Sequence, residues 1–108
     1  MIHLTADTRI LLATKPADFR SGIDGFVALC RHQLKQEPRA AGTLFVFINR
    51  RQTMVRVLRY DGTGFWLMSK RLSQGRFRAW PKAEHSVTPL AARQLKTLLT
   101  GHAGWQQL

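Results

Sequence analysis

Residues 43–72 read TLFVFINRRQTMVRVLRYDGTGFWLMSKRL, and three strand-like segments follow one another in this stretch. The first, residues 43–49, is a continuous apolar run rich in β-forming residues, which is typical of a buried central strand. A short basic turn separates it from a second strand at residues 53–61. The DGTG sequence at residues 61–64 is a strong hairpin signal, so residues 65–72 are expected to return as a third strand. This stretch therefore predicts a three-stranded antiparallel meander.

Two helices and one further strand are expected around the meander. From about Ser21 to Gln36 the apolar residues recur at helical spacing, and Ser21 is suited to the N-cap position. Thr88 and Pro89 are typical of the N-cap and first residue of a later helix, and residues 9–14 resemble a short strand. The sequence thus predicts an α+β fold. A small three-stranded or larger antiparallel sheet would pack against an N-terminal helix, followed by a short C-terminal helix.

The length and composition of the chain limit its organisation. With 108 residues, 44% of them apolar, the chain can bury one core but hardly two, so residues 1–108 are expected to form a single domain. The apolar runs are too short to span a bilayer, and the N-terminus lacks the pattern of a secretory signal. The lone cysteine, Cys30, excludes an intramolecular disulfide. We expect a cytoplasmic protein that makes no membrane contact.

Positive charge is concentrated in one part of the chain. The 17 Lys and Arg residues outnumber 6 Asp and Glu residues, which gives a formal net charge of +11 and a pI of ≈ 11.6. Arginine predominates among the cations, and its guanidinium group binds phosphate through two hydrogen bonds and stacks on flat rings. Residues 50–82 hold nine cations and one acid, Asp61, so the basic meander region (about 43–82) carries most of the net charge. Such a region favours contact with a polyanion.

No catalytic or cofactor motif stands out in the sequence. The six acids are scattered, whereas a metal-dependent nuclease needs two or three carboxylates that converge on the metal. The four histidines lack the spacing of a metal site, and Cys30 falls in the apolar register of the first helix, which is typical of a core residue. We therefore expect no enzymatic activity, no metal or other cofactor, and no small-molecule substrate.

The candidate contact residues are basic and aromatic. A single arginine on a strand can simply face solvent and resist aggregation, but a cluster with so few acids favours nucleic acid. The candidates for nucleic-acid binding are Arg50, Arg51, Arg59, Lys70, Arg71, Arg76 and Arg78. Trp66, Phe77 and Trp80 are candidates for base stacking or for a protein interface, although aromatic residues in a small domain more often belong to the core.

Several sequence blocks resemble one known family. FVFINRR, YDGTGFWL and KRLSQGRFRAWP occur in this order, with DFRSGIDG upstream. Together they resemble the TnpB-type accessory proteins that the second open reading frame of IS66-class bacterial insertion sequences encodes. The resemblance covers nearly the whole chain. It implies a role in transposition beside a separate, larger DDE transposase, and it carries over no catalytic residue.

Two functions remain open on this basis. A DNA-binding accessory protein would touch element DNA, or the transposase–DNA complex, through phosphate contacts that position the protein without specifying a sequence. A protein–protein adaptor would instead use the arginines and the exposed rings to dock on the transposase or on the element's other accessory protein, without direct DNA contact. RNA binding by an aromatic-decorated sheet is a weaker third reading, because the strands lack an alternating pattern of rings.

Overall fold

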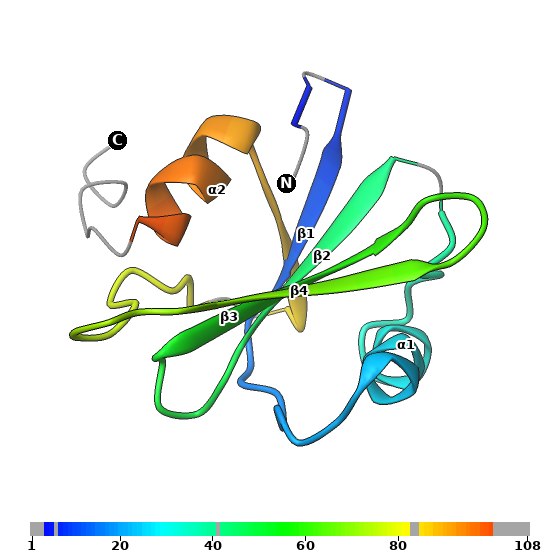
Figure 1. Cartoon of the computed structure of the whole chain (residues 1–108). Helices are drawn as coiled ribbons and strands as arrows, with labels where there is room; N and C mark the ends of the chain where they lie inside the picture. Colours follow the sequence, from blue (N-terminus) through cyan, green and yellow to red (C-terminus); the bar gives the residue numbers. More distant parts are fainter. Residues whose placement is uncertain (1–3, 6, 41, 83–84, 101–108) are drawn as a thin grey trace.

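The computed structural model describes residues 4–5, 7–40, 42–82 and 85–100, and over these residues a five-stranded sheet carries a helix on each face (Figure 1). The order of the strands across the sheet is β4-β3-β2-β1-β5. The class is α+β, as expected. The elements are β1 (Arg9–Ala13), α1 (Ile23–His32), β2 (Thr43–Ile48), β3 (Met54–Tyr60), β4 (Phe65–Arg71), β5 (Val87–Leu90) and α2 (Ala92–Leu99).

The antiparallel meander predicted from residues 43–72 is confirmed. β2 pairs with β3, and β3 pairs with β4, both in antiparallel fashion. The β3–β4 hairpin closes where the Asp61 N–H donates to the Gly64 carbonyl at 3.0 Å. Gly62 takes a φ of 99° in this turn, a conformation that glycine adopts without the steric cost a side chain would bring.

The sheet as a whole is mixed, which corrects the expectation of an antiparallel sheet. β1 pairs with β2 in parallel, with Leu11 opposite Phe45, and α1 lies in the long connection that a parallel pair requires. On its other side β1 pairs with β5 in antiparallel fashion. Pairing between segments this far apart in the sequence leaves no local signal, so the sequence predicts the antiparallel meander but not the parallel pairing of β1 with β2.

Both helix starts differ from the prediction. Thr88 and Pro89 lie in β5 instead of beginning a helix, and Pro89 is tolerated because β5 is an edge strand that can spare an N–H group. α2 starts at Ala92, where the Gln94 side chain accepts the Ala91 N–H at 2.8 Å. α1 is shorter than expected and has Gly22 at its N-cap position in place of Ser21.

Apolar side chains cover both faces of the sheet. On one face, Phe26 and Cys30 of α1 pack against inward-facing side chains of β1, β2 and β3. On the other face, Leu95 and Leu98 of α2 pack on the sheet together with side chains from the segment after β4. In the part of the chain that is described, no helix combines the length and apolar character needed to cross a membrane. Because both faces are covered, polar groups of the sheet that could contact a ligand are expected at the ends of the strands and at the edges of the sheet.

Candidate nucleic-acid interface

The strand directions bring most of the candidate cations to one end of the sheet. β1, β2 and β4 finish at this end and β3 and β5 begin there, so the β2–β3 turn lies beside the segment that follows β4. Two backbone hydrogen bonds join these loops: the Phe77 N–H donates to the Gln52 carbonyl at 2.7 Å, and the Leu72 N–H donates to the Thr53 carbonyl at 3.0 Å. We call this region the basic end. Its cations are Arg20, Arg50, Arg51, Arg71, Arg76, Arg78 and Lys82.

Asn49 shapes the turn that presents Arg50 and Arg51. Its Oδ1 atom accepts the backbone N–H groups of Thr53 at 2.9 Å and Met54 at 3.0 Å, while its Nδ2 donates to Thr53 Oγ1 at 3.0 Å. Both arginines are exposed, and neither has an ion-pair partner among the described residues. The carboxamide thus holds a turn whose two guanidinium groups are available to a ligand.

Burial alternates along the segment after β4. Phe77 and Trp80 are only 1% and 7% exposed, and the Trp80 Nε1–H donates to the Ala13 carbonyl at 2.9 Å. Arg76 and Arg78, which flank Phe77, are exposed. The two aromatic rings therefore anchor this segment to the core and are not accessible for base stacking or for a protein interface, which corrects that expectation for Phe77 and Trp80.

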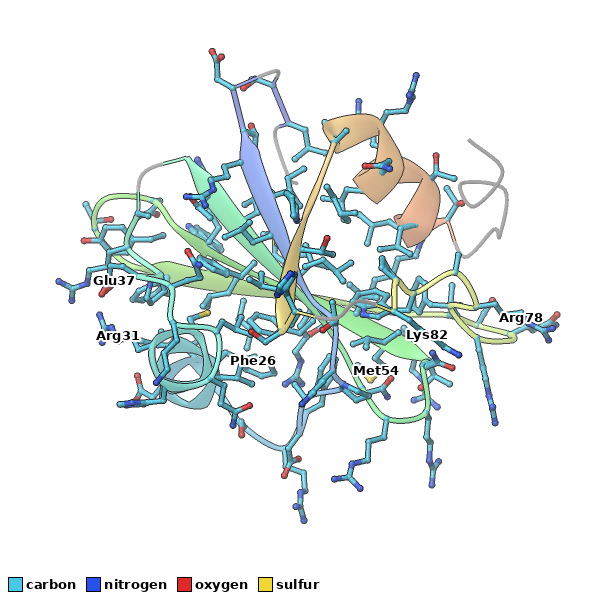
Figure 2. The ribbon with its side chains drawn as sticks, turned by 180° about the vertical axis from the view of Figure 1, so that it is seen from behind. Phe26, Arg31, Glu37, Met54, Arg78 and Lys82 are labelled. Atoms are coloured by element: carbon cyan, nitrogen blue, oxygen red, sulfur yellow. The ribbon has the colours of Figure 1, made fainter. Side chains whose placement is uncertain are left out.

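Two open hollows border the β2–β3 turn. Arg50 and Arg51 line the first together with the Asp18–Arg20 loop, while Arg76 and Arg78 line the second. Figure 2 shows Arg78 and Lys82 on the same side of the molecule as Met54, away from Arg31 and Glu37 on the other side. Cations from three separate loops therefore line one continuous end of the sheet.

Asp18 is the acid that lines these hollows, and it is already paired. Its carboxylate accepts two side-chain hydrogen bonds from Arg20, from Nη2 at 2.8 Å and from Nε at 3.0 Å, and the Arg20 backbone N–H at 2.9 Å. The side-chain bonds from Arg20 chiefly, with a contribution from Arg50, lower the pKa of Asp18 to about 2. Since this carboxylate bonds mainly to Arg20, the other arginines of the basic end are not neutralised by direct contact.

Arg59 lies away from the basic end, whereas Lys70 lies next to Arg71 near that end and is bonded to α2. Arg59 is near the finish of β3, directly across from Trp66 of β4, at the opposite end of the sheet. Lys70 is exposed on β4, and its Nζ donates to the carbonyl of Leu99 at the last turn of α2. The structure therefore brings together five of the seven cationic candidates, engages the neighbouring Lys70 with the end of α2, and places Arg59 at the opposite end of the sheet.

Arg56 has a structural role that the sequence did not reveal. Its guanidinium lies 4.7 Å from the centroid of the Phe19 ring, and its Nη1 donates to the carbonyls of Phe19 at 2.8 Å and Ser21 at 3.0 Å. Its Nε donates to Ser69 Oγ at 2.9 Å. Arg56 thus ties the loop before α1 to the sheet, and its guanidinium is engaged in contacts within the protein.

Comparison with known proteins identifies the family. The profile described as "IS66 Orf2 like protein" matches residues 8–108. The chain belongs to this family. An uncharacterized protein of Sinorhizobium fredii, y4hO, is 37% identical over 101 residues, which cover 94% of this chain and 86% of the relative. A second uncharacterized protein of that organism, y4jC, is 34% identical over 101 residues, with 94% and 85% covered. No solved structure matches the chain significantly.

The family match confirms the resemblance to the TnpB-type accessory proteins of IS66 elements. Within the described residues of this IS66 Orf2-like protein, no group of three or more His, Cys, Asp or Glu side chains is placed to hold a metal ion. Burial raises the pKa of the Cys30 thiol to about 12, so the thiolate that a nucleophile requires does not form near neutral pH.

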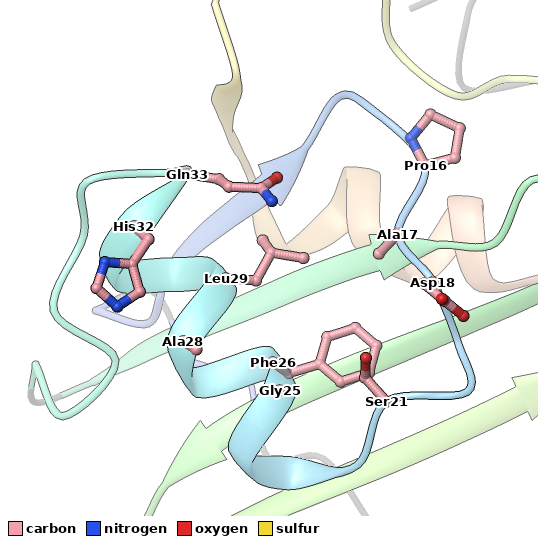
Figure 3. A pocket seen from close by; sticks show the side chains of 10 residues that line it. All are labelled: Pro16, Ala17, Asp18, Ser21, Gly25, Phe26, Ala28, Leu29, His32 and Gln33. Carbon is pink, nitrogen blue, oxygen red and sulfur yellow. The ribbon is translucent and has the colours of Figure 1, made fainter.

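Another hollow lies between α1 and the loop before it (Figure 3). The side chains that line it include those of Phe26, Leu29 and His32 from the helix and Asp18 from the loop. Gly25 is required here, because a Cβ atom at this position would lie 2.6 Å from the Ser21 Cβ. The Asp18 carboxylate in this hollow is already bonded to Arg20, so it is not available to orient His32 as a general base.

Proposed function

We propose that this IS66 Orf2-like protein is a non-catalytic accessory protein of transposition that binds duplex DNA through its basic end. The observation that carries the proposal is the convergence of the β2–β3 turn and the segment after β4, joined by the hydrogen bond between Phe77 and Gln52. Arg50, Arg51, Arg76 and Arg78 are exposed there and have no ion-pair partner among the described residues.

The arrangement suits a phosphate backbone better than base edges. A guanidinium group forms two parallel hydrogen bonds with one phosphate, and several such contacts fix the position of a protein on a duplex without reading its sequence. The buried Phe77 ring in one loop and the hydrogen bonds of the half-buried Asn49 side chain in the other hold the loops in place before DNA binds. The natural partners would be element DNA, the transposase of the same element and the other accessory protein.

The proposal is tested by fluorescence anisotropy of the purified protein on two labelled duplexes. One duplex carries the terminal inverted repeat of the element and the other a scrambled sequence of equal length. We expect binding to both, with log K falling linearly with log salt concentration at a slope near −0.9 for each phosphate contacted. A strong preference for the terminal repeat would add sequence recognition to the proposal, whereas no binding at physiological salt would refute it.

A specific observation also favours the adaptor function, at a different place on the molecule. Trp66 is 58% exposed and lies at the end of the sheet opposite the basic end. Large exposed aromatic side chains are enriched among the residues that dominate protein–protein binding energy. A protein that docks on Trp66 would therefore not compete with DNA bound between the β2–β3 turn and the segment after β4.

A further inference from the structure

Trp66 is exposed, yet its ring is held in one orientation. Its Nε1–H donates to Asp61 Oδ2 at 2.8 Å. The other oxygen of Asp61 accepts the backbone N–H groups of Thr63 at 2.8 Å and Gly64 at 2.9 Å, so the hairpin turn fixes the carboxylate that fixes the ring. A side chain that is already ordered loses little conformational entropy when a partner packs against it.

The strand that carries Trp66 is an edge strand with unused backbone groups. The Leu72 N–H donates to Thr53 and the Asp61 N–H donates to Gly64, which sets the alternation of the β3–β4 ladder. From this register, Trp66, Met68 and Lys70 bond back to β3. The N–H and C=O groups that point away from the sheet are those of Phe65, Leu67, Ser69 and Arg71.

The two edges of the sheet differ in how they are protected. β5 has four residues and contains Pro89, both of which oppose pairing with another strand. β4 has seven residues, none of them proline, and it pairs on one side only within the described part of the chain. Of the two edges, β4 is therefore the one that can accept an added strand.

The positive charge near β4 indicates what kind of segment could pair with this edge. Lys70 and Arg71 are exposed at one end of β4, and the whole chain carries a net charge of +11, so a second copy would be repelled at long range and an acidic segment attracted. Nucleic acid is disfavoured at the Trp66 end of the strand, because the Asp61 carboxylate lies against the indole. We propose that β4 binds an extended segment of another protein by strand addition, with acids opposite Lys70 and Arg71 and with apolar side chains against Trp66.

This mode combines backbone pairing for affinity with side-chain contacts for specificity. The Trp66 contact is separate from the DNA-binding surface, because the ring lies at the opposite end of the sheet from the β2–β3 turn, whereas Arg71 belongs both to this edge and to the basic end. One molecule could therefore hold DNA at one end and an acidic protein segment along its edge, which is what a linking subunit of a transposition complex requires.

A synthetic peptide tests the proposal directly. The probe is a blocked peptide as long as β4, with two glutamates at one end and valine and threonine along the rest, titrated into the ¹⁵N-labelled full chain and followed by NMR. We expect shifts of the backbone amides of Phe65, Leu67, Ser69 and Arg71 and of the Trp66 indole N–H. A peptide of the same sequence with N-methyl groups on alternate residues, which cannot pair with a strand, should cause none of these shifts.

Variants complete the test. Trp66→Ala should weaken the affinity for the peptide at least about tenfold. Ile23→Ala, which removes the other large apolar side chain that is exposed among the described residues, should change this affinity less than about twofold. Both variants should keep the duplex affinity of the parent protein. The proposal is overturned by an absence of shifts at about 2 mM peptide, by shifts confined to the basic end, or by equal binding of the N-methylated peptide. Self-association in sedimentation that Trp66→Ala abolishes would also overturn it, since a second copy would then occupy the edge.

Discussion

Replacing Arg56 with methionine should destabilise the fold, although arginine on a strand usually faces solvent. The substitution removes the hydrogen bonds to the carbonyls of Phe19 and Ser21 and to the Ser69 hydroxyl, and also the stacking on the Phe19 ring. Methionine keeps most of the side-chain volume, so the change reports mainly on the lost polar contacts.

The magnitude follows from these contacts. Each hydrogen bond contributes about 1 kcal/mol net, more when one partner is charged, and stacking on an aromatic ring contributes about 0.5–1 kcal/mol at a partly exposed site. Water can reach part of this half-buried site and replace some of the bonds, so we expect a loss of about 2–4 kcal/mol in the free energy of unfolding. For a chain of this length that corresponds to a decrease in Tm of roughly 10–20 °C.

Urea denaturation followed by circular dichroism measures this loss, and Arg59→Met is the matched control. Arg59 lies on the same strand, is exposed, and makes no side-chain hydrogen bond or ion pair with a described residue. Its substitution should change stability by less than about 0.5 kcal/mol. If the two variants unfold at the same urea concentration, Arg56 does not hold the loop before α1 in the way described.

Three further predictions concern the basic end and the core. Asn49→Ala should lower the free energy of unfolding in urea by roughly 1.5–3 kcal/mol, because the turn loses its side-chain hydrogen bonds. It should also weaken duplex binding, although the net charge does not change. Unchanged duplex affinity would show that the turn presents its arginines without the support of Asn49. The pKa of Asp18 lies at about 2 against an ordinary 3.8, so its contribution to stability is present above pH 3.8 and lost as the pH falls toward 2. Asp18→Asn should therefore flatten the dependence of Tm on pH in that window, and parallel curves for the two proteins would contradict the pairing with Arg20. The Cys30 thiol, buried and with a pKa raised to about 12, should not react with a thiol reagent at pH 8 until denaturant is added, and rapid labelling of the native protein would show that this part of the core opens.

Local sequence patterns predict the meander, but they do not predict the pairing of strands that are far apart in the sequence. The continuous apolar run of β2 and the DGTG turn each specify their structure within a few residues, and both appear as expected. β5 was missed because its four residues are few and Thr88-Pro89 fits a helix start equally well. Its strand conformation depends on pairing with β1, which lies more than 70 residues earlier in the chain.

The basic end, too, could be predicted only in part from local sequence patterns. The excess of arginine is visible in the composition, but the meeting of Arg50 and Arg51 with Arg76 and Arg78 depends on a tertiary hydrogen bond between their loops. Alternation along β3 puts Arg56 and Arg59 on opposite faces, yet it does not say which face the loop before α1 covers. Burial of Phe77 depends likewise on the packing of the segment after β4 against the sheet.

The DNA-binding proposal is tested most directly by two quadruple variants that remove the same charge from opposite ends of the sheet. The first replaces Arg50, Arg51, Arg76 and Arg78 with alanine, and the second replaces Arg9, Arg39, Arg59 and Arg93, which are also exposed. Their affinities for one duplex are measured by anisotropy over a salt series.

Binding through the basic end predicts that the first variant loses most of its affinity. Its salt slope should become shallower by about 3.6 if each arginine contacts one phosphate. The second variant should retain nearly the slope of the parent protein, with only the small general weakening that a lower net charge brings. Equal losses in the two variants would mean that DNA responds to the total charge of the protein, and the basic end would then not be a binding site.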